Sequence, residues 1–161
     1  MHFEGDQTIN APIESVWAYF MDPNKVAQCA PGFKSMEVLS SDHFKPTLNV
    51  GIGPVKATFT LDVTLGGLRP PNHAEVAARG NAAGSAVNIT SAVDLVANDP
   101  AVTSMHWTAD VAVSGTLASV GARLMESTAQ KLTAKFFDCT RQHLEPPGSA
   151  STASPSSASG G

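Results

Sequence analysis

The chain has 161 residues, of which 42% are hydrophobic and 15% charged, and its formal net charge at pH 7 is −4. This balance is typical of one soluble domain with a sizeable core, and without a long basic run it argues against wrapping nucleic acid. No stretch approaches the roughly 18 consecutive apolar residues of a transmembrane helix. The start MHFEGDQTIN also lacks the basic and apolar regions of a secretion signal. We therefore expect a cytoplasmic protein.

The N-terminal part of the chain predicts one strand followed by two short helices. Residues 3–10 alternate between apolar and polar, which is typical of a strand. An Ala-Pro dipeptide then opens a helix, IESVWAYFMD, whose apolar residues recur at helical spacing. An Asp-Pro dipeptide ends that helix, and NKVAQC predicts a second short helical segment before a Pro-Gly turn.

From Phe33 to Val113 the pattern changes to strands joined by tight turns. In FKPTLNVGI the even-numbered positions are apolar, whereas in VKATFTLDVTL the odd-numbered positions are, so the parity switches across Gly53-Pro54. A two-residue hairpin requires this switch, because it brings the two apolar sets onto one face. The predicted pairs are Ile52 with Val55, Val50 with Ala57, and Leu48 with Phe59.

The same reasoning predicts a second hairpin at Gly84-Ser85. The predicted pairs are Ala82 with Val87, Gly80 with Ile89, Ala78 with Ser91, and Val76 with Val93. A third turn, Asn-Asp-Pro, leads into the alternating segment MHWTADVAV. Because the hairpins follow one another directly, we expect an antiparallel meander.

The glycine-rich stretch GIGPVKATF does not fit a phosphate-binding loop. A Walker-type loop needs G-x-x-x-x-G-K-[ST] between a strand and a helix, and a dinucleotide fingerprint needs glycines that open a helix. Here strands are predicted on both sides of the glycines, and the alternation places Lys56 on the outer face. The stretch is therefore interpreted as a hairpin turn.

The last folded segment, TLASVGARLMESTAQKLTAKFFDCTRQHL, predicts one helix about 40 Å long, capped by Ser114 or Thr116. Its apolar stripe is Leu117, Val120, Leu124, Leu132, Phe136 and Cys139. A sheet that is apolar on one face needs a cover, and only this helix is large enough. We expect an α+β helix-grip fold: a curved antiparallel sheet wrapped on a long C-terminal helix, with two short helices after the first strand.

The composition changes abruptly after this helix. Residues 146–161 are rich in Ser, Ala, Pro and Gly and contain no large apolar side chain. Such a segment buries too little apolar area to offset the entropy of ordering. The predicted organisation is a helix-grip domain over residues 1–145 and a disordered tail over 146–161.

Several phrases together resemble the CoxG family of carbon monoxide dehydrogenase subunits, within the START-like (polyketide cyclase, SRPBCC) superfamily. They are FEGDQTINAPIESVW, CAPGF, VGIGPVKATF and WTADVAVSGTLASVGARL, in this order. The resemblance covers roughly residues 1–144. It implies an accessory protein of a molybdenum hydroxylase of the carbon monoxide dehydrogenase type, linked to attaching that enzyme to the membrane. It also implies that the functional region is the cavity between the sheet and the long helix.

Small side chains support such a cavity, because Ala74, Ala78, Gly80 and Ala82 share the apolar face of the second predicted hairpin. They leave volume beneath the helix unless neighbouring side chains fill it. The predicted ligand-binding wall is Phe33, Leu48, Phe59, Leu61, Val76, Ala78, Ile89, Ser91, Met105, Trp107, Leu117, Val120 and Leu124. The Ser91 hydroxyl can hydrogen-bond one ligand oxygen. A filled core of the same residues remains an open alternative.

The polar residues predict neither a metal site nor a catalytic one. His43, His73 and His143 have no Cys, Asp or His partner at ligand spacing. Cys29 and Cys139 could pair with each other, but we expect two free thiols without a neighbouring base. We find no titratable group on the predicted inner face, which argues against acid–base catalysis.

Three functions remain open at this point. The first is a non-enzymatic carrier and adaptor that holds a quinone-like or lipid ligand, has no covalent or metal cofactor, and docks a molybdenum hydroxylase at the inner face of the cell membrane. The second is a small enzyme of the cyclase or dehydratase type, which requires an ionisable residue in the cavity. The third is an assembly factor with a filled core.

Overall fold

The computed structural model describes residues 1–82 and 84–145 of the chain. The predicted tail, residues 146–161, lies outside the described residues. Among the described residues, no helix is both long enough and apolar enough to cross a membrane.

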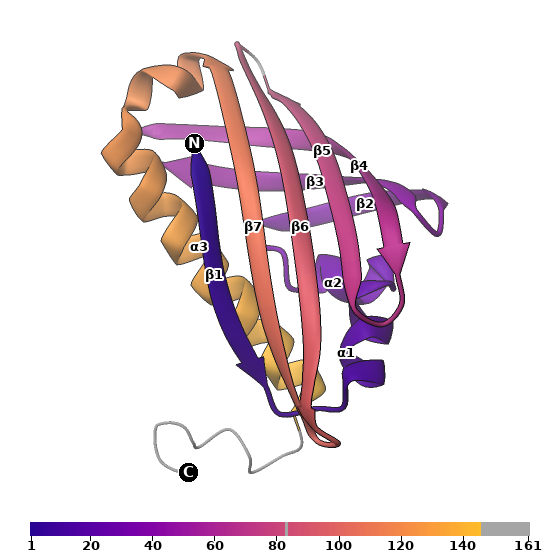
Figure 1. Ribbon diagram of the computed structural model, residues 1–161. Coiled ribbons are helices and arrows are strands. Elements are labelled where there is room, and N and C mark those ends of the chain that lie inside the picture. Colours follow the sequence, from indigo (N-terminus) through magenta and orange to yellow (C-terminus); the bar gives the residue numbers. More distant parts are fainter. Residues whose placement is uncertain (83, 146–161) are drawn as a thin grey trace.

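A single seven-stranded antiparallel sheet forms the body of the protein (Figure 1). Its strands are β1 (His2–Ile9), β2 (Phe33–Ser40), β3 (His43–Ile52), β4 (Val55–Arg69), β5 (His73–Ala82), β6 (Ser85–Asp99) and β7 (Val102–Gly115). The spatial order is β1-β7-β6-β5-β4-β3-β2, so β2 to β7 form the predicted meander and β1 closes the sheet beside β7.

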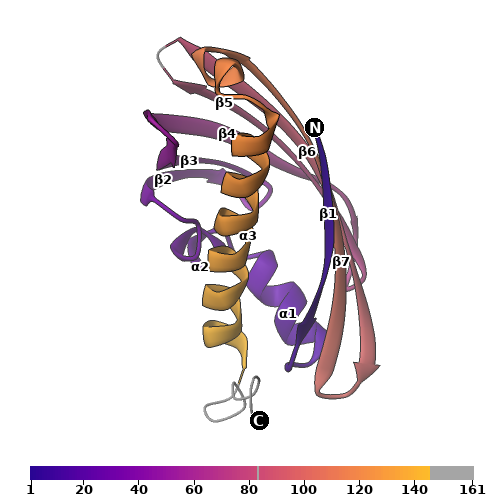
Figure 2. The same ribbon diagram turned by 90° about the vertical axis from the view of Figure 1, so that its left-hand side faces the viewer.

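Within the described residues, four helical segments accompany the sheet: α1 (Ile13–Phe20), α2 (Pro23–Gln28), the 3-10 helix η1 (Thr116–Val120) and α3 (Ala122–Leu144). The sheet is strongly curved, and α3 runs along its concave side (Figure 2). The predicted α+β helix-grip fold is therefore confirmed, including the two short helices after the first strand.

The first predicted hairpin has the expected register, and the second does not. Strands β3 and β4 pair Ile52 with Val55, and the turn glycine Gly53 has a φ of +59°. Strands β5 and β6 instead pair Ala82 with Ser85, so their turn falls one residue earlier than predicted. The observed pairs are Gly80 with Val87, Ala78 with Ile89, Val76 with Ser91 and Ala74 with Val93. Each partner moves by two positions, which leaves every side chain on its predicted face.

The C-terminal helix is shorter than the sequence predicts. Gly121 has a φ of +90°, which interrupts the helical path between η1 and α3. The 23 residues of α3 therefore span about 34 Å. The predicted cap at Ser114 or Thr116 is wrong, because Gly121 is the residue that precedes α3 and it offers no side chain.

The buried residues form two separate clusters on the concave side. The first joins β1, α1, β6, β7 and α3 through Ile9, Ala11, Ile13, Val16, Leu95, Met105 and Phe137. The second joins β3, β4 and η1 through Ile52, Phe59 and Leu117. The candidate site borders the first cluster.

Candidate functional site

An apolar cavity of about 430 Å³ lies between the concave face of the sheet, the two short helices and α3. Its lining residues are Trp17, Phe20, Met21, Val26, Pro31, Phe44, Val63, Leu65, Ala74, Val76, Ser91, Val93, Leu95, Met105, Trp107, Leu132, Thr133, Phe136 and Phe137. None of them carries an ionisable side chain. The volume lies within the range of pockets that bind small organic molecules.

The aromatic part of the lining depends on a glycine in β1. Gly5 lies opposite Trp107 in the sheet, and a Cβ atom at Gly5 would approach the Trp107 ring to 3.0 Å. The missing side chain therefore leaves the space in which the indole lies on the inner face. Trp107 also packs against Phe137 of α3, with ring centroids 6.3 Å apart.

Four hydrogen-bonding groups belong to the lining side chains: the hydroxyls of Ser91 and Thr133 and the indole Nε1 groups of Trp17 and Trp107. The Ser91 hydroxyl donates to the backbone oxygen of Thr108 at 2.7 Å, so its proton is already used within the sheet. Thr133 contributes a second hydroxyl, from α3. The Trp107 Nε1 atom is buried and has no hydrogen-bond acceptor among the described residues. This atom lies against Gly5, 3.1 Å from where a Cβ would stand, and is closed off from the cavity. The Thr133 hydroxyl can therefore satisfy one oxygen atom of an otherwise apolar molecule.

The predicted wall residues fall into three groups. Val76, Ser91, Met105 and Trp107 line the cavity. Phe59, Leu61, Leu117, Val120 and Leu124 pack together in the second cluster instead. Phe33 lies opposite Leu48 across β2 and β3, and Ala78 lies opposite Ile89 across β5 and β6; none of these four lines the cavity.

The sequence analysis missed lining residues in both the helical part and the sheet. The first set is Trp17, Phe20, Met21 and Val26 near the N-terminus, with Leu132, Thr133, Phe136 and Phe137 of α3; the second is Pro31, Phe44, Val63, Leu65, Ala74, Val93 and Leu95. The prediction placed the first turns of the long helix over the cavity, but the break at Gly121 packs those turns into the second cluster. The apolar spacing of Trp17 and Phe20, and of Leu132 and Phe136, was the signal that could have found them.

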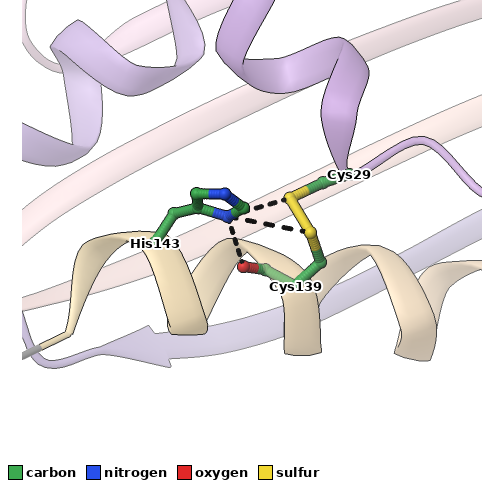
Figure 3. A group of neighbouring side chains, drawn as sticks. All are labelled: Cys29, Cys139 and His143. Atoms are coloured by element: carbon green, nitrogen blue, oxygen red, sulfur yellow. Dashed lines mark hydrogen bonds between the residues drawn. A yellow bond between two sulfur atoms is a disulfide. The ribbon is translucent and has the colours of Figure 1, made fainter. Parts of the chain in front are cut away.

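The two cysteines are joined, which corrects the expectation of free thiols. Cys29, directly after α2, forms a disulfide with Cys139 of α3, and their Cα atoms are 5.4 Å apart (Figure 3). His143 lies one helical turn beyond Cys139, with its Nδ1 atom 3.5 Å from the Cys29 Sγ and 3.7 Å from the Cys139 Sγ. The expectation that His143 has no cysteine partner is therefore wrong.

Tyr19 of α1 completes the surroundings of the disulfide. Its hydroxyl donates to the Cys29 Sγ at 2.8 Å, and its ring lies 6.0 Å from the His143 ring, centroid to centroid. Burial raises the pKa of Tyr19 above its ordinary value, which keeps the hydroxyl protonated as a donor.

The other histidines lie beside carboxylates on neighbouring strands, contrary to the sequence expectation for His43 and His73. His43 contacts Asp62 at 2.7 Å. The two ring nitrogens of His73 contact Asp94 at 2.7 Å and Glu75 at 2.9 Å. Hydrogen bonding, first to Asp94 and then to Glu75, raises the pKa of His73. No histidine is among the cavity-lining residues.

His106 is exposed and pairs with an acidic residue of β1, as expected for a side chain that points away from the cavity. Its Nδ1 atom lies 2.9 Å from a carboxylate oxygen of Asp6. This hydrogen bond raises the pKa of His106.

Solved structures share this architecture along nearly the whole chain. A conserved protein from Geobacillus kaustophilus is 26% identical, with a TM-score of 0.84 over 89% of this chain and 94% of that one. A START superfamily protein from Mycobacterium smegmatis is 12% identical, with a TM-score of 0.71 over 89% and 97%. The Zhui aromatase/cyclase from Streptomyces sp. R1128 is 16% identical, with a TM-score of 0.66 over 89% and 92%.

The curved sheet and the long helix along its concave side define the START-like, helix-grip fold. A comparison with curated proteins gave no match. The model of the CoxG family of carbon monoxide dehydrogenase subunits matches residues 5–145, and the chain belongs to this family.

Proposed function

We propose that the chain is a non-catalytic accessory protein of a molybdenum hydroxylase of the carbon monoxide dehydrogenase type, which holds a quinone-like or lipid ligand in its cavity. In this role it helps to couple the enzyme to the membrane or to the respiratory chain. The association with the enzyme rests on family membership. The ligand class rests on the cavity, and this is the observation that carries the proposal.

The cavity supports an apolar ligand because almost every group that lines it is aliphatic or aromatic. Burial of apolar surface contributes about 25 cal/mol per Å², so each 100 Å² of an isoprenoid or acyl chain gives about 2.5 kcal/mol. The Thr133 hydroxyl favours a ligand with a carbonyl oxygen. A quinone ring with an isoprenoid tail combines both features.

Intrinsic fluorescence tests this proposal directly, because the chain has two tryptophans and both line the cavity. A short-tailed quinone added to the protein should quench Trp17 and Trp107 in a saturable way. The blocking variant is Ala74→Phe, which projects a ring into the cavity from β5. Its matched control is Ala77→Phe, on the same strand but on the exposed face.

The expected result is saturable quenching in the wild-type protein and in Ala77→Phe, and at least a tenfold weaker Kd in Ala74→Phe. Equal quenching of the two variants, or linear quenching without saturation, would contradict binding in this cavity. Docking of the enzyme is measured separately by co-purification with carbon monoxide dehydrogenase subunits. Ala74→Phe should leave docking unchanged, because the substitution lies inside the protein.

A cyclase- or dehydratase-type enzyme is the second candidate, favoured by the fold shared with the Zhui aromatase/cyclase. Acid–base chemistry needs a positioned titratable group within hydrogen-bond reach of the substrate. The described cavity lining offers two hydroxyls and two indoles instead. Turnover of a polyketide-like substrate, abolished by Ala74→Phe and retained in Ala77→Phe, would favour this candidate over the carrier.

A further inference from the structure

Two cysteines and a histidine meet where the end of α2 faces the last turns of α3 (Figure 3). The ligand atoms of Cys29, Cys139 and His143 all lie within 4.8 Å of one another. We propose that these three side chains form a zinc site when the disulfide is reduced, so that the same cysteines alternate between a cross-link and a metal–thiolate centre.

The distances from the histidine to the two sulfur atoms already fit a tetrahedral zinc site. With Zn–S bonds of about 2.3 Å and a Zn–N bond of about 2.0 Å, tetrahedral angles place the nitrogen about 3.5 Å from each sulfur. The observed distances from the His143 Nδ1 atom are 3.5 Å to the Cys29 Sγ and 3.7 Å to the Cys139 Sγ. After reduction, the two sulfur atoms need only to separate to about 3.8 Å, the corresponding distance between two zinc-bound thiolates.

The positions of the three side chains, at the end of α2 and on α3, also fit a zinc site. Cys139 and His143 are four residues apart on one helix, so they share a face of α3. Cys29 comes from the opposite side, where α2 ends. Thiolate and imidazole together are a ligand set typical of zinc. Three protein ligands leave the fourth position to water, and the exposed His143 side chain provides access for it.

A hydrogen-bond donor, the Tyr19 hydroxyl, lies beside the Cys29 sulfur. The Tyr19 hydroxyl, 2.8 Å from the Cys29 Sγ, would donate a hydrogen bond to the metal-bound sulfur. In the cross-linked state, the His143 Nδ1 atom lies 3.0 Å from the backbone oxygen of Cys139. Zinc takes the place of the proton on Nδ1, and the neutral ring then carries its proton on Nε2. The Cys139 oxygen keeps its acceptor role within α3.

The conversion between the two states is a thiol–disulfide exchange. A dithiol reductant attacks the disulfide through one thiolate, forms a mixed disulfide and releases one cysteine thiolate. Its second thiol then closes the reductant's own disulfide and releases the second cysteine, so that two electrons pass to the protein. Zinc binding to the two thiols displaces two protons. Oxidation by a disulfide of the same class reverses the exchange and releases zinc.

The test is a zinc titration of the full chain, with and without a metal-free phosphine reductant, under exclusion of oxygen. Cobalt serves as a spectroscopic probe, because tetrahedral cobalt–thiolate coordination gives absorption bands that zinc then removes. The ligand variant is His143→Gln. The matched control is His106→Gln, which removes an exposed imidazole from the outer face of the sheet.

We expect one equivalent of zinc to bind to the reduced wild-type protein and to reduced His106→Gln, and none to the disulfide form. His143→Gln should weaken binding at least tenfold. Equal binding by the reduced and oxidised proteins, or unchanged affinity in His143→Gln, would overturn the proposal. If reduction alone unfolds the chain, refolding is measured instead. Zinc must then restore the native circular dichroism spectrum of the reduced wild-type protein, and failure to do so also overturns the proposal.

Discussion

Removal of the Cys29–Cys139 cross-link should lower the stability of the protein more than most single substitutions in its core. The perturbation is the double variant Cys29→Ala/Cys139→Ala. The disulfide closes a loop with a sequence separation of 110 residues, which spans β2 to β7 and most of α3. Without it, the unfolded chain gains the freedom that this loop closure removes.

The magnitude follows from the loop length. The chain-entropy relation gives about 4.8 kcal/mol at 25 °C for a loop of 110 residues. Measured losses for native disulfides are about 2–5 kcal/mol, so this value is the upper end of the expectation. With a urea m-value of about 1–3 kcal/mol/M, a loss of 4.8 kcal/mol lowers the unfolding midpoint by at least about 1.5 M.

The assay is urea unfolding followed by circular dichroism, in a chelating buffer so that metal binding does not contribute to stability. The wild-type protein in reductant is the matched control, because it lacks the cross-link but keeps both sulfur atoms. It should unfold within about 1 kcal/mol of the double variant. If the oxidised wild-type protein and the double variant share one midpoint and one m-value, the cross-link does not constrain the unfolded chain and the reasoning is refuted.

Three further predictions, on the packing, the turns and the outer face, are tested by the same denaturation assay. Ile9→Ala, at a fully buried position, should cost about 2–5 kcal/mol, whereas Val96→Ala, at a side chain 58% exposed, should stay within about 0.5 kcal/mol. Gly115→Ala should lower the free energy of unfolding by about 1–3 kcal/mol or more, because φ is +77° and the new Cβ would collide with a backbone oxygen. Its control, Gly51→Ala, meets no atom within 4 Å and should lower the free energy of unfolding far less. His73→Gln should reduce stability most below about pH 6.5, and the difference should shrink as pH rises through the raised folded pKa of His73.

The fold could be predicted because its signals are local. The parity switch across Gly53-Pro54 fixed the register of the first hairpin, and alternation placed the apolar face. At the second hairpin, alternation fixed the face, but several small residues near the turn left the exact turn position underdetermined. A shift of one turn position therefore changed every partner without exposing any apolar side chain.

The site was harder to predict because it depends on contacts between distant segments. The break at Gly121 determines which part of the C-terminal segment covers the cavity. A single glycine within a helical pattern is not enough to predict such a break from the sequence. The disulfide joins residues 110 positions apart, and two cysteines with no metal spacing gave no reason to pair them. Cys139 and His143 did carry a helical spacing, but the third ligand comes from the other end of the chain.

The cavity and the cysteine site share one stretch of α3, and this links their chemistry. Phe136 and Phe137 line the cavity, and Cys139 and His143 follow them within two helical turns. On the facing side, Phe20 lines the cavity and packs edge-on against Tyr19, whose hydroxyl donates to the Cys29 sulfur. A change in the separation of Cys29 and Cys139 therefore acts on the walls of the cavity. Suppose that reduction and zinc binding change the affinity of the cavity for its ligand by a given factor. Thermodynamic linkage then requires that the ligand change the equilibrium between the cross-linked and the zinc-bound states by the same factor. In an accessory protein that carries a redox-active ligand, the occupancy of the cavity would in this way change the balance between the disulfide and the zinc-bound form of Cys29 and Cys139.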